Sequence, residues 1–313
     1  MEFIKLKQVS KEYSRKKVLE DVNLVIEEGD ILGVVGESGS GKTTLLSLIA
    51  GFIEPTEGEV TYFSRIHQQE RNLNRNIHQV KKHIGFTPQH NSFYPKLTVK
   101  ENLLHFGRLY GLKDKTLLDN ITGLLSLVRL MEHQNKLAGH LSGGMQKRLD
   151  ISCSLIHKPK ILVLDEPTAD LDPLLRKDIL NLLQEANKQG ITIVLASHDL
   201  ENVEDICNKV AFVHQGKVHT QGLIDEIKKP FQSDSFTISV RGKEKERIYR
   251  YLKSTNNPQI IDLGDSLVVY PDNIQQTISG LLKIIDQERL NLHDLNFRNV
   301  PLKNIFEKIT GRN

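Results

Sequence analysis

The sequence feature that constrains the fold most is a glycine-rich loop that directly follows a run of apolar residues. The segment ILGVVG (31–36) predicts a strand buried on both faces, and the loop GESGSGKT (36–43) begins at its last residue. The loop fits the pattern G-x-x-x-x-G-K-[ST], and the apolar segment after it predicts a helix that ends at Gly51. This order of strand, loop and helix predicts an α/β protein built on a P-loop core.

The residue types of this loop predict a site for the phosphates of a nucleotide. Its glycines let backbone N–H groups face phosphate oxygens, the ammonium of Lys42 reaches the terminal phosphates, and the hydroxyl of Thr43 can bind Mg²⁺. A plain glycine-rich turn is the alternative, and the buried strand before the loop argues against it. The residues expected to bind the nucleotide here are Gly36, Glu37, Ser38, Gly39, Ser40, Gly41, Lys42, Thr43 and Thr44.

Polar side chains at the ends of three other predicted strands complete this site. Asp165 and Glu166 follow the strand ILVL, His198 follows ITIVLAS, and Gln89 follows FTP. Because ligands bind at the carboxyl ends of parallel strands, we expect these groups to lie at one edge of the sheet. Asp165 would hold Mg²⁺, Glu166 would act as general base on the attacking water, and Gln89 would contact the metal or the water. The position of His198 near a γ-phosphate predicts a catalytic or sensing role.

Two other features have both a structural and a functional explanation. The segment LSGGMQKRLD (141–150) places Ser142 at the expected start of a helix, and helix N-termini attract anions. The chain would then carry a second phosphate site in addition to its P-loop. Tyr13 lies in the early sheet region, where its ring could stack on an adenine, although the pattern alone favours ordinary packing.

The rest of the pattern predicts a mostly parallel sheet with an antiparallel β part at its start. Strands that alternate with helices are typical of a parallel sheet, and period-two alternation indicates half-buried antiparallel strands. The predicted strands lie at 3–9, 21–26, 57–63, 161–165 and 191–197, and the predicted helices at 98–130 (interrupted by Gly111) and 173–189. A hairpin is expected at 209–218, with its turn near Gln215 and Gly216. The polar segment 64–79 is expected to be a surface loop that runs into a short helix.

The pattern changes near residues 228–235, and we expect a domain boundary there. Residues 1–229 would form the nucleotide-binding domain, with a helical subdomain at about 92–145. Residues 230–313 alternate predicted strands with predicted helices, which indicates a small α+β accessory domain. The strands are expected at 236–241 and 266–270, and the helices at 243–253 and 273–287.

Composition excludes several classes of protein. The 42 basic and 39 acidic residues give a net charge of +3, which is too balanced to predict nucleic-acid binding. No run approaches about 18 apolar residues, so we expect no membrane span, and the N-terminus does not resemble a secretion signal. The two cysteines, Cys153 and Cys207, form no metal-binding motif and suit a reducing compartment. We therefore expect a cytoplasmic protein.

The motifs together resemble a known family. In order along the chain they are GESGSGKT, FTPQ, LSGGMQKR, ILVLDEPTADLD and ASHD. With them, residues 1 to about 228 resemble the nucleotide-binding domain of ATP-binding-cassette (ABC) transporters. LSGGMQKR is similar to the signature sequence of that family, which few other P-loop proteins have. The resemblance implies an ATPase that takes ATP and Mg²⁺ and powers a separate membrane subunit.

The resemblance also implies roles for individual residues. Tyr13 matches the aromatic residue that stacks on adenine, which reverses the preference for packing stated above. Gln89 matches the Q-loop glutamine, which touches Mg²⁺ and links the site to the membrane subunit. Glu166 matches the catalytic glutamate and His198 the switch histidine. Asp172 matches the D-loop aspartate, which crosses to the partner subunit in the family.

A homodimer follows from the same resemblance. In the family, two nucleotide-binding domains meet head to tail, and the signature helix of one closes over the ATP of the other. Ser142, Gly143 and Gly144 would then meet the γ-phosphate held by a second copy. The partners implied are that second copy and an integral membrane permease, with no nucleic acid, and the subunit would lie peripherally on the cytoplasmic face of the membrane. Asp150 stands where relatives often have Asn, Ser or Ala, outside the family's ATP contacts, so no effect on activity is expected from it.

The end of the chain, VPLKNIFEKITGR, resembles the ending of a subset of bacterial and archaeal cassette subunits that work with export-type permeases. The resemblance implies export of drugs, lipids, polysaccharides or ions, with residues 231–313 as a docking or dimer-stabilising appendix. Two alternatives are a soluble ABC-type ATPase in a non-transport role, such as iron–sulfur assembly or regulation, and a regulatory module that binds ATP without useful hydrolysis.

Overall fold

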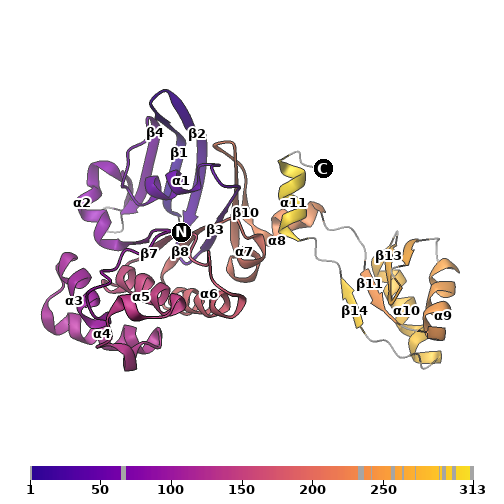
Figure 1. Ribbon diagram of the computed structural model, residues 1–313. Helices are drawn as coiled ribbons and strands as arrows, with labels where there is room; N and C mark the ends of the chain where they lie inside the picture. Colours follow the sequence, from indigo (N-terminus) through magenta and orange to yellow (C-terminus); the bar gives the residue numbers. More distant parts are fainter. Residues whose placement is uncertain are drawn as a thin grey trace. The chain divides into compact units, whose positions relative to one another are not determined.

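The computed structural model of the chain divides into two compact units, Met1–Ile224 and Asp225–Asn313. Each unit is described by itself (Figure 1). The structure describes residues 2–64, 68–231, 236–240, 242–254, 258–262, 264–271, 273–288, 290, 294–297 and 301–310. The predicted division after residue 229 stays a prediction. No helix in these described ranges is long and apolar enough to cross a bilayer.

A six-stranded, mostly parallel sheet forms the core of the first unit. Its strand order is β10-β9-β3-β8-β7-β6, and all neighbours are parallel except the hairpin of β9 and β10. The strands are β3 (Ile31–Val35), β6 (Ile84–Thr87), β7 (Ile161–Asp165), β8 (Thr192–Ser197), β9 (Lys209–His214) and β10 (Lys217–Leu223). The predicted turn at Gln215 and Gly216 is present, and both residues have the positive φ that a tight hairpin turn requires. The predicted α/β P-loop fold is confirmed.

A four-stranded antiparallel sheet lies beside this core, in the order β2-β1-β4-β5. It contains β1 (Glu2–Tyr13), β2 (Lys16–Glu27), β4 (Glu57–Ser64) and β5 (Gln69–Asn72). Helix α1 (Lys42–Ile49) contacts β2 of this sheet as well as β7 and β8 of the core sheet, so one apolar core joins the two sheets (Figure 1).

The prediction of a surface loop within residues 64–79 is wrong for residues 69–72. These residues form the edge strand β5. This strand is polar because an edge strand is held by backbone pairing on one side and by ion pairs rather than by burial. Its residues pair with β4, and the carboxylate of Glu70 accepts from the ammonium of Lys7 at 2.5 Å. The expected short helix is present as α2 (Ile77–Val80), flanked by the 3₁₀ turns η1 (Asn74–Asn76) and η2 (Lys81–His83). Residues 65–67 lie outside the described residues.

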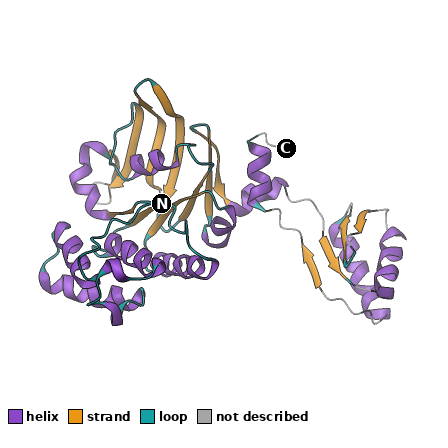
Figure 2. Cartoon of the chain, in the orientation of Figure 1, coloured by secondary structure: helices purple, strands orange, loops and turns teal. Residues whose placement is uncertain are grey.

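Helices pack beside the core sheet and form a helical part of the first unit (Figure 2). Helix α3 (Val99–Leu109) begins with a capping box, in which Thr98 and Glu101 satisfy each other's backbone N–H groups. Gly111, at φ 77°, separates α3 from α4 (Asp114–Leu127), as predicted. The other helices of the unit are η3 (Met131–His133), η4 (Ala138–His140), α5 (Gly143–Leu155), α6 (Pro173–Lys188) and α7 (Leu200–Ile206).

The second unit contains an antiparallel sheet in the order β12-β13-β11-β14, packed with two helices. Its core is apolar and includes Phe236, Ile248, Leu267 and Leu281. The predicted strands and helices correspond to β11 (Phe236–Ser239), β13 (Ser266–Tyr270), α9 (Gly242–Ser254) and α10 (Ile274–Glu288). The structure adds β12 (Gln259–Asp262), β14 (Asp294–Phe297) and α11 (Leu302–Ile309), which the pattern did not predict. Helix α8 (Ile224–Lys228) and the 3₁₀ turn η5 (Lys229–Phe231) come at the start of this part of the chain.

Candidate nucleotide-binding site

The predicted polar groups meet at the carboxyl edge of the core sheet. The neighbouring strands β3, β8, β7 and β6 are parallel, so their carboxyl ends lie along one edge (Figure 1). The glycine-rich loop follows β3, Gln89 comes two residues after β6, and His198 follows β8. Asp165 is the last residue of β7, with Glu166 next to it. The topology therefore gathers the four motifs as the sequence predicted.

The loop after β3 wraps around the start of α1. Gly41 is the residue before the helix and has φ +106°, a left-handed conformation that favours glycine. At Gly36 a Cβ would lie 2.2 Å from the carbonyl oxygen of Val213, so the loop approaches β9 too closely for a side chain. The ammonium of buried Lys42 donates to the carbonyl oxygens of Gly36 and Glu37, at 2.8 and 3.0 Å. The loop is thus closed around its own lysine.

The acidic residues at the end of β7 make direct contacts with other members of the site. The hydroxyl of Thr43 donates to Oδ2 of Asp165 at 2.7 Å. One carboxylate oxygen of Glu166 lies 3.7 Å from the Lys42 ammonium, and the other lies 3.0 Å from Nδ1 of His198. Glu166 is buried, and its N–H donates to the carbonyl of Ala196 in β8. Its backbone has a positive φ of +48°, which is uncommon for a residue other than glycine. Backbone strain of this kind is concentrated at functional sites, because the surrounding structure must hold it in place.

These residues line a cavity of about 560 Å³. Its lining contains eleven of the predicted residues, from the loop and from the ends of β6, β7 and β8, and one that the prediction missed, Val18. The predicted ones are Glu37, Ser38, Gly39, Gly41, Lys42, Thr43, Thr44, Gln89, Asp165, Glu166 and His198. Val18 follows the β1–β2 turn at an unremarkable apolar position, so no local signal marks it. A cavity that combines a phosphate loop, a buried lysine and carboxylates is suited to a nucleoside triphosphate.

Tyr13 lies outside the described lining of this cavity. It is the last residue of β1, 45% exposed, and the Lys11 ammonium lies 5.1 Å from the centre of its ring. The exposed ring is available for stacking, and the adenine contact of Tyr13 stays a prediction.

The signature segment also lies outside this lining. Ser142 is the residue before α5, and Ser142 and Gly143 are exposed. The Ser142 side chain makes no capping hydrogen bond to the first N–H groups of α5. Asp172 serves as the cap of α6, since its Oδ1 accepts from the N–H groups of Leu174 and Leu175, both at 3.0 Å.

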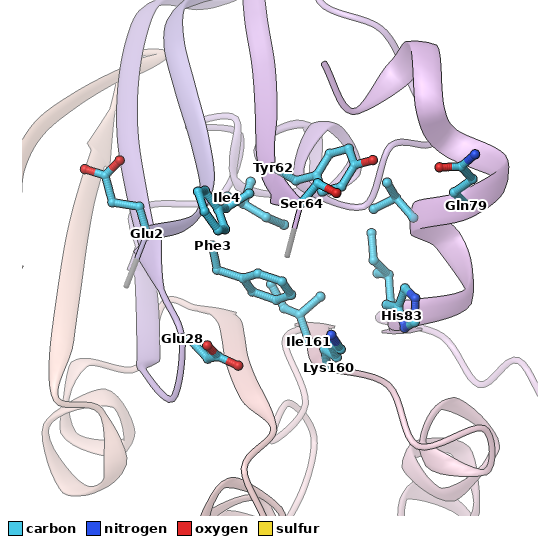
Figure 3. Close-up of a pocket in the computed structure, with 13 residues that line it drawn as sticks. Glu2, Phe3, Ile4, Glu28, Tyr62, Ser64, Gln79, His83, Lys160 and Ile161 are labelled. Carbon is cyan, nitrogen blue, oxygen red and sulfur yellow. The ribbon is translucent and has the colours of Figure 1, made fainter. Parts of the chain in front are cut away.

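A second cavity, of about 130 Å³, lies at the opposite ends of the strands. Figure 3 shows apolar side chains such as those of Phe3 and Ile161 at its centre, with Glu2 toward one side and His83 and Lys160 toward the other. Burial and the nearby charges of Lys160 and Lys82 lower the pKa of His83. The described lining contains no glycine-rich loop, so this cavity is separate from the nucleotide site.

The fold and the site together define a P-loop ATPase. A family model described as "ABC transporter" matches residues 19–169. Relatives of similar sequence include the linearmycin resistance ATP-binding protein LnrL of Bacillus subtilis, which is 27% identical over 99% of this chain and 98% of its own length. The Nod factor export ATP-binding protein I of Sinorhizobium fredii is 32% identical over 99% of this chain and 86% of its own. The methionine import ATP-binding protein MetN of Clostridioides difficile is 36% identical over 72% of this chain and 70% of its own length.

Solved structures agree with this assignment. The dimeric structure of a post-hydrolysis state of an ATP-binding cassette, bound to ADP and Pi, superimposes with a TM-score of 0.62 at 29% identity, over 71% of this chain and 98% of that one. The chain belongs to the ABC transporter family. The predicted class, an ATP-binding and ATP-hydrolysing subunit of ABC transporters, is confirmed.

Proposed function

We propose that two copies of this chain form a head-to-tail dimer that holds two ATP molecules and powers a separate membrane permease. ABC cassettes form dimers and act with transporter membrane subunits, and the structural neighbour bound to ADP and Pi is a dimer. The observation that carries the proposal is the contrast between the two glycine-containing helix starts of one chain. At the start of α1 the side chains of Lys42 and Thr43 have polar partners, whereas at the start of α5 Ser142 and Gly143 are exposed.

Each residue at the sheet edge has a task in this proposal. The loop N–H groups and Lys42 hold the phosphates, and the ammonium exchanges its two carbonyl partners for phosphate oxygens. Glu166 accepts a proton from the attacking water, and the neighbouring His198 holds the carboxylate in place through its 3.0 Å contact. Tyr13 stacks on the adenine, and Asp172 faces the partner subunit.

Mg²⁺ fits the residues present. Thr43, Asp165 and Gln89 supply oxygen atoms at the edge of the cavity, and the first two are already in contact at 2.7 Å. In the described part of the chain, no group of three or more His, Cys, Asp or Glu side chains could hold a metal ion. Mg²⁺ is commonly bound through one or two carboxylates together with substrate phosphates, which matches this sparse set. When bound, the ion would neutralise phosphate charge.

The signature turn completes the site of the other copy. Ser142, Gly143 and Gly144 open a helix of 13 residues, whose N-terminus carries about half a unit of positive charge. A γ-phosphate held by a second copy would accept hydrogen bonds from the first N–H groups of this helix. ATP thereby acts as a bridge between subunits, and its higher affinity for the closed dimer supplies the conformational work.

Export is the direction that the comparisons favour. The relatives named for linearmycin resistance and for Nod factor export match over 99% of this chain, including its second unit, whereas the methionine import protein matches over 72%. The subunit would then lie on the cytoplasmic face of the membrane, bound to its permease. The second candidate, an ABC-type ATPase without a transport role, predicts an ATPase that does not co-purify with a membrane protein.

The composite site is tested by mixing two inactive variants. Lys42→Ala disables the phosphate loop and keeps the signature turn, whereas Ser142→Arg blocks the turn and keeps the loop. A mixed dimer has one site with both defects and one complete site. We expect each variant alone to release phosphate at least about 100-fold more slowly than wild type. A 1:1 mixture should recover up to about a quarter of the wild-type rate, because half of random dimers are mixed and each has one intact site.

The double variant Lys42→Ala/Ser142→Arg, mixed 1:1 with Lys42→Ala, is the matched control, since none of its dimers contains a complete site and no recovery is expected. The absence of recovery in the first mixture would contradict the composite site. Wild-type turnover by Ser142→Arg alone would remove the signature turn from the reaction. Retention of the chain by a membrane protein during purification from membranes separates the transport role from the non-transport one.

A further inference from the structure

The signature helix α5 carries a fully buried acidic residue, Asp150, about two turns after Ser142. Its exposed fraction is 0%, and it lies outside the described lining of the nucleotide cavity. Isolated carboxylates are almost never buried, because the loss of hydration is costly unless partners compensate for it. The partners of Asp150 therefore indicate what the residue is for.

Those partners belong to the segment that follows β6 and contains Gln89. Oδ1 of Asp150 accepts from the backbone N–H of Ser92 at 2.8 Å and from its hydroxyl at 2.6 Å. Two charge-assisted hydrogen bonds on one oxygen fix the position of Ser92 relative to α5. Ser92 comes three residues after Gln89, which lines the nucleotide cavity.

Two other side chains of α5 reach the same segment. The Lys147 ammonium lies 3.5 Å from the carbonyl oxygen of Gln89 and 3.9 Å from Oδ2 of Asp150. The amide of Asn91 donates to the side chain of Gln146 at 3.4 Å. One face of α5 thus holds residues 89–92 at three points, of which Asp150 supplies the shortest contacts.

Two opposing effects act on the charges of Asp150 and Lys147: burial disfavours both charges, and their mutual attraction favours them. Burial raises the pKa of Asp150 and lowers the pKa of Lys147, although each charge favours the other. Within the described residues Oδ2 of Asp150 has no hydrogen bond, and the Lys147 ammonium at 3.9 Å is the charge that compensates for its burial. A buried ion pair of this geometry adds little to stability, and such pairs are better explained by the specific geometry that they impose.

We propose that Asp150 is a positioning residue that locks the Gln89 segment to the signature helix. A displacement of Gln89 at the nucleotide then moves α5, and with it the Ser142 turn that serves the opposite site. The inference rests on the proposed function for its link to catalysis, whereas the contact itself stands on the geometry of one chain. It differs from the expectation stated above, that Asp150 would have no effect on activity because it lies outside the family's ATP contacts.

The test compares Asp150→Ala and Asp150→Asn in the full-length chain. Hydrogen–deuterium exchange of residues 88–93 reports the lock without nucleotide, and kcat and KM for ATP report its effect on turnover. We expect Asp150→Ala to accelerate exchange of the Ser92 amide and to lower kcat, each by about 10-fold or more, with KM within about twofold of wild type. Asp150→Asn keeps an oxygen acceptor for Ser92 and should restore most of the protection and of kcat.

Two further variants separate positioning from stability. Lys209→Gln breaks another partly buried ion pair, in which the Lys209 ammonium lies 2.9 Å from the carboxylate of Asp30, the residue before β3. This variant should leave exchange of residues 88–93 and kcat unchanged. Ser92→Ala changes the exposed partner instead of the buried one, so it tests the same contact even if Asp150→Ala fails to fold; we expect a smaller loss of kcat. Unchanged exchange in Asp150→Ala, or faster exchange with wild-type kcat, would overturn the proposal. Because exchange is measured without nucleotide, its result does not depend on whether the mixed dimer recovers activity.

Discussion

The starts of helices α1 and α5 are alike in sequence and different in their surroundings. Each follows a turn of serine and glycine, and neither has a side-chain cap. At α1, Lys42 and Thr43 already contact Gly36, Glu37 and Asp165. At α5, Ser142 and Gly143 are exposed, and the nearest lysine of the helix turns toward Gln89 instead. One chain therefore contains a phosphate loop whose side chains contact one another and a separate helix start whose first residues are exposed.

The glycines of the two turns differ in the same way. At Gly41 a Cβ would lie 2.7 Å from Leu19, and the residue has positive φ, so its own chain requires a glycine. At Gly143 a Cβ would meet nothing within 4 Å. The phosphate loop is thus explained by contacts within one chain, whereas the glycine at 143 has no such explanation. A close approach by another molecule would supply one.

The largest expected effect concerns Glu166, at the phosphate-loop side of the comparison. Glu166→Gln keeps the size and the buried position of the side chain but removes the base, so turnover should fall by about 100- to 10,000-fold while ATP binding persists. Size-exclusion chromatography with ATP should then show an accumulated dimer. The surface variant Glu185→Gln, whose partner Lys188 is on the same helix, serves as the control and should behave as wild type. Near-normal phosphate release by Glu166→Gln would remove Glu166 from the role of base.

A smaller effect separates the two glycines of the signature turn. At Gly144 a Cβ would lie 2.6 Å from Cδ2 of Leu175 in α6, and this half-buried side chain must shift, so Gly144→Ala should lower the free energy of unfolding by no more than about 1 kcal/mol. Gly143→Ala has room within the chain and should leave thermal unfolding unchanged, yet lower phosphate release. Thermal melts and phosphate assays of both variants check this. If Gly143→Ala had wild-type turnover, no second molecule would approach closely at residue 143.

The sequence predicted most of the site because its motifs are local and lie at strand ends. The parallel topology that unites Lys42, Asp165 and His198 follows from the alternation of strands and helices. Strand β5 was missed because its polar residues are held by pairing with β4 and not by burial. The contact of Asp150 with Ser92 was missed for a similar reason, since the two residues are distant in sequence and only the fold brings them together.

The smallest effect concerns the contacts of His157 at the carboxyl end of the signature helix α5. His157 follows α5, its Nε2 lies 3.2 Å from the carbonyl oxygen of Ile84 in β6, and its ring stacks on Tyr110 at 3.6 Å. Burial lowers the pKa of His157 from 6.5 to about 4. Between these values the unfolded chain takes up a proton that the folded chain does not, so this residue makes stability fall as the pH drops through this range.

Replacement of His157 should therefore remove part of the acid sensitivity. His157→Phe keeps a ring against Tyr110 but loses the contact with β6, so its stability at neutral pH should be lower than that of wild type. On acidification from about pH 7 to pH 5.5 the variant should lose about 1 kcal/mol less than wild type. Urea titrations across this range measure the difference, and Tyr110→Phe, which keeps the imidazole and the stack, should follow the wild-type curve. If His157→Phe also followed that curve, folding would not lower the pKa of His157, and the acid sensitivity would come from other groups.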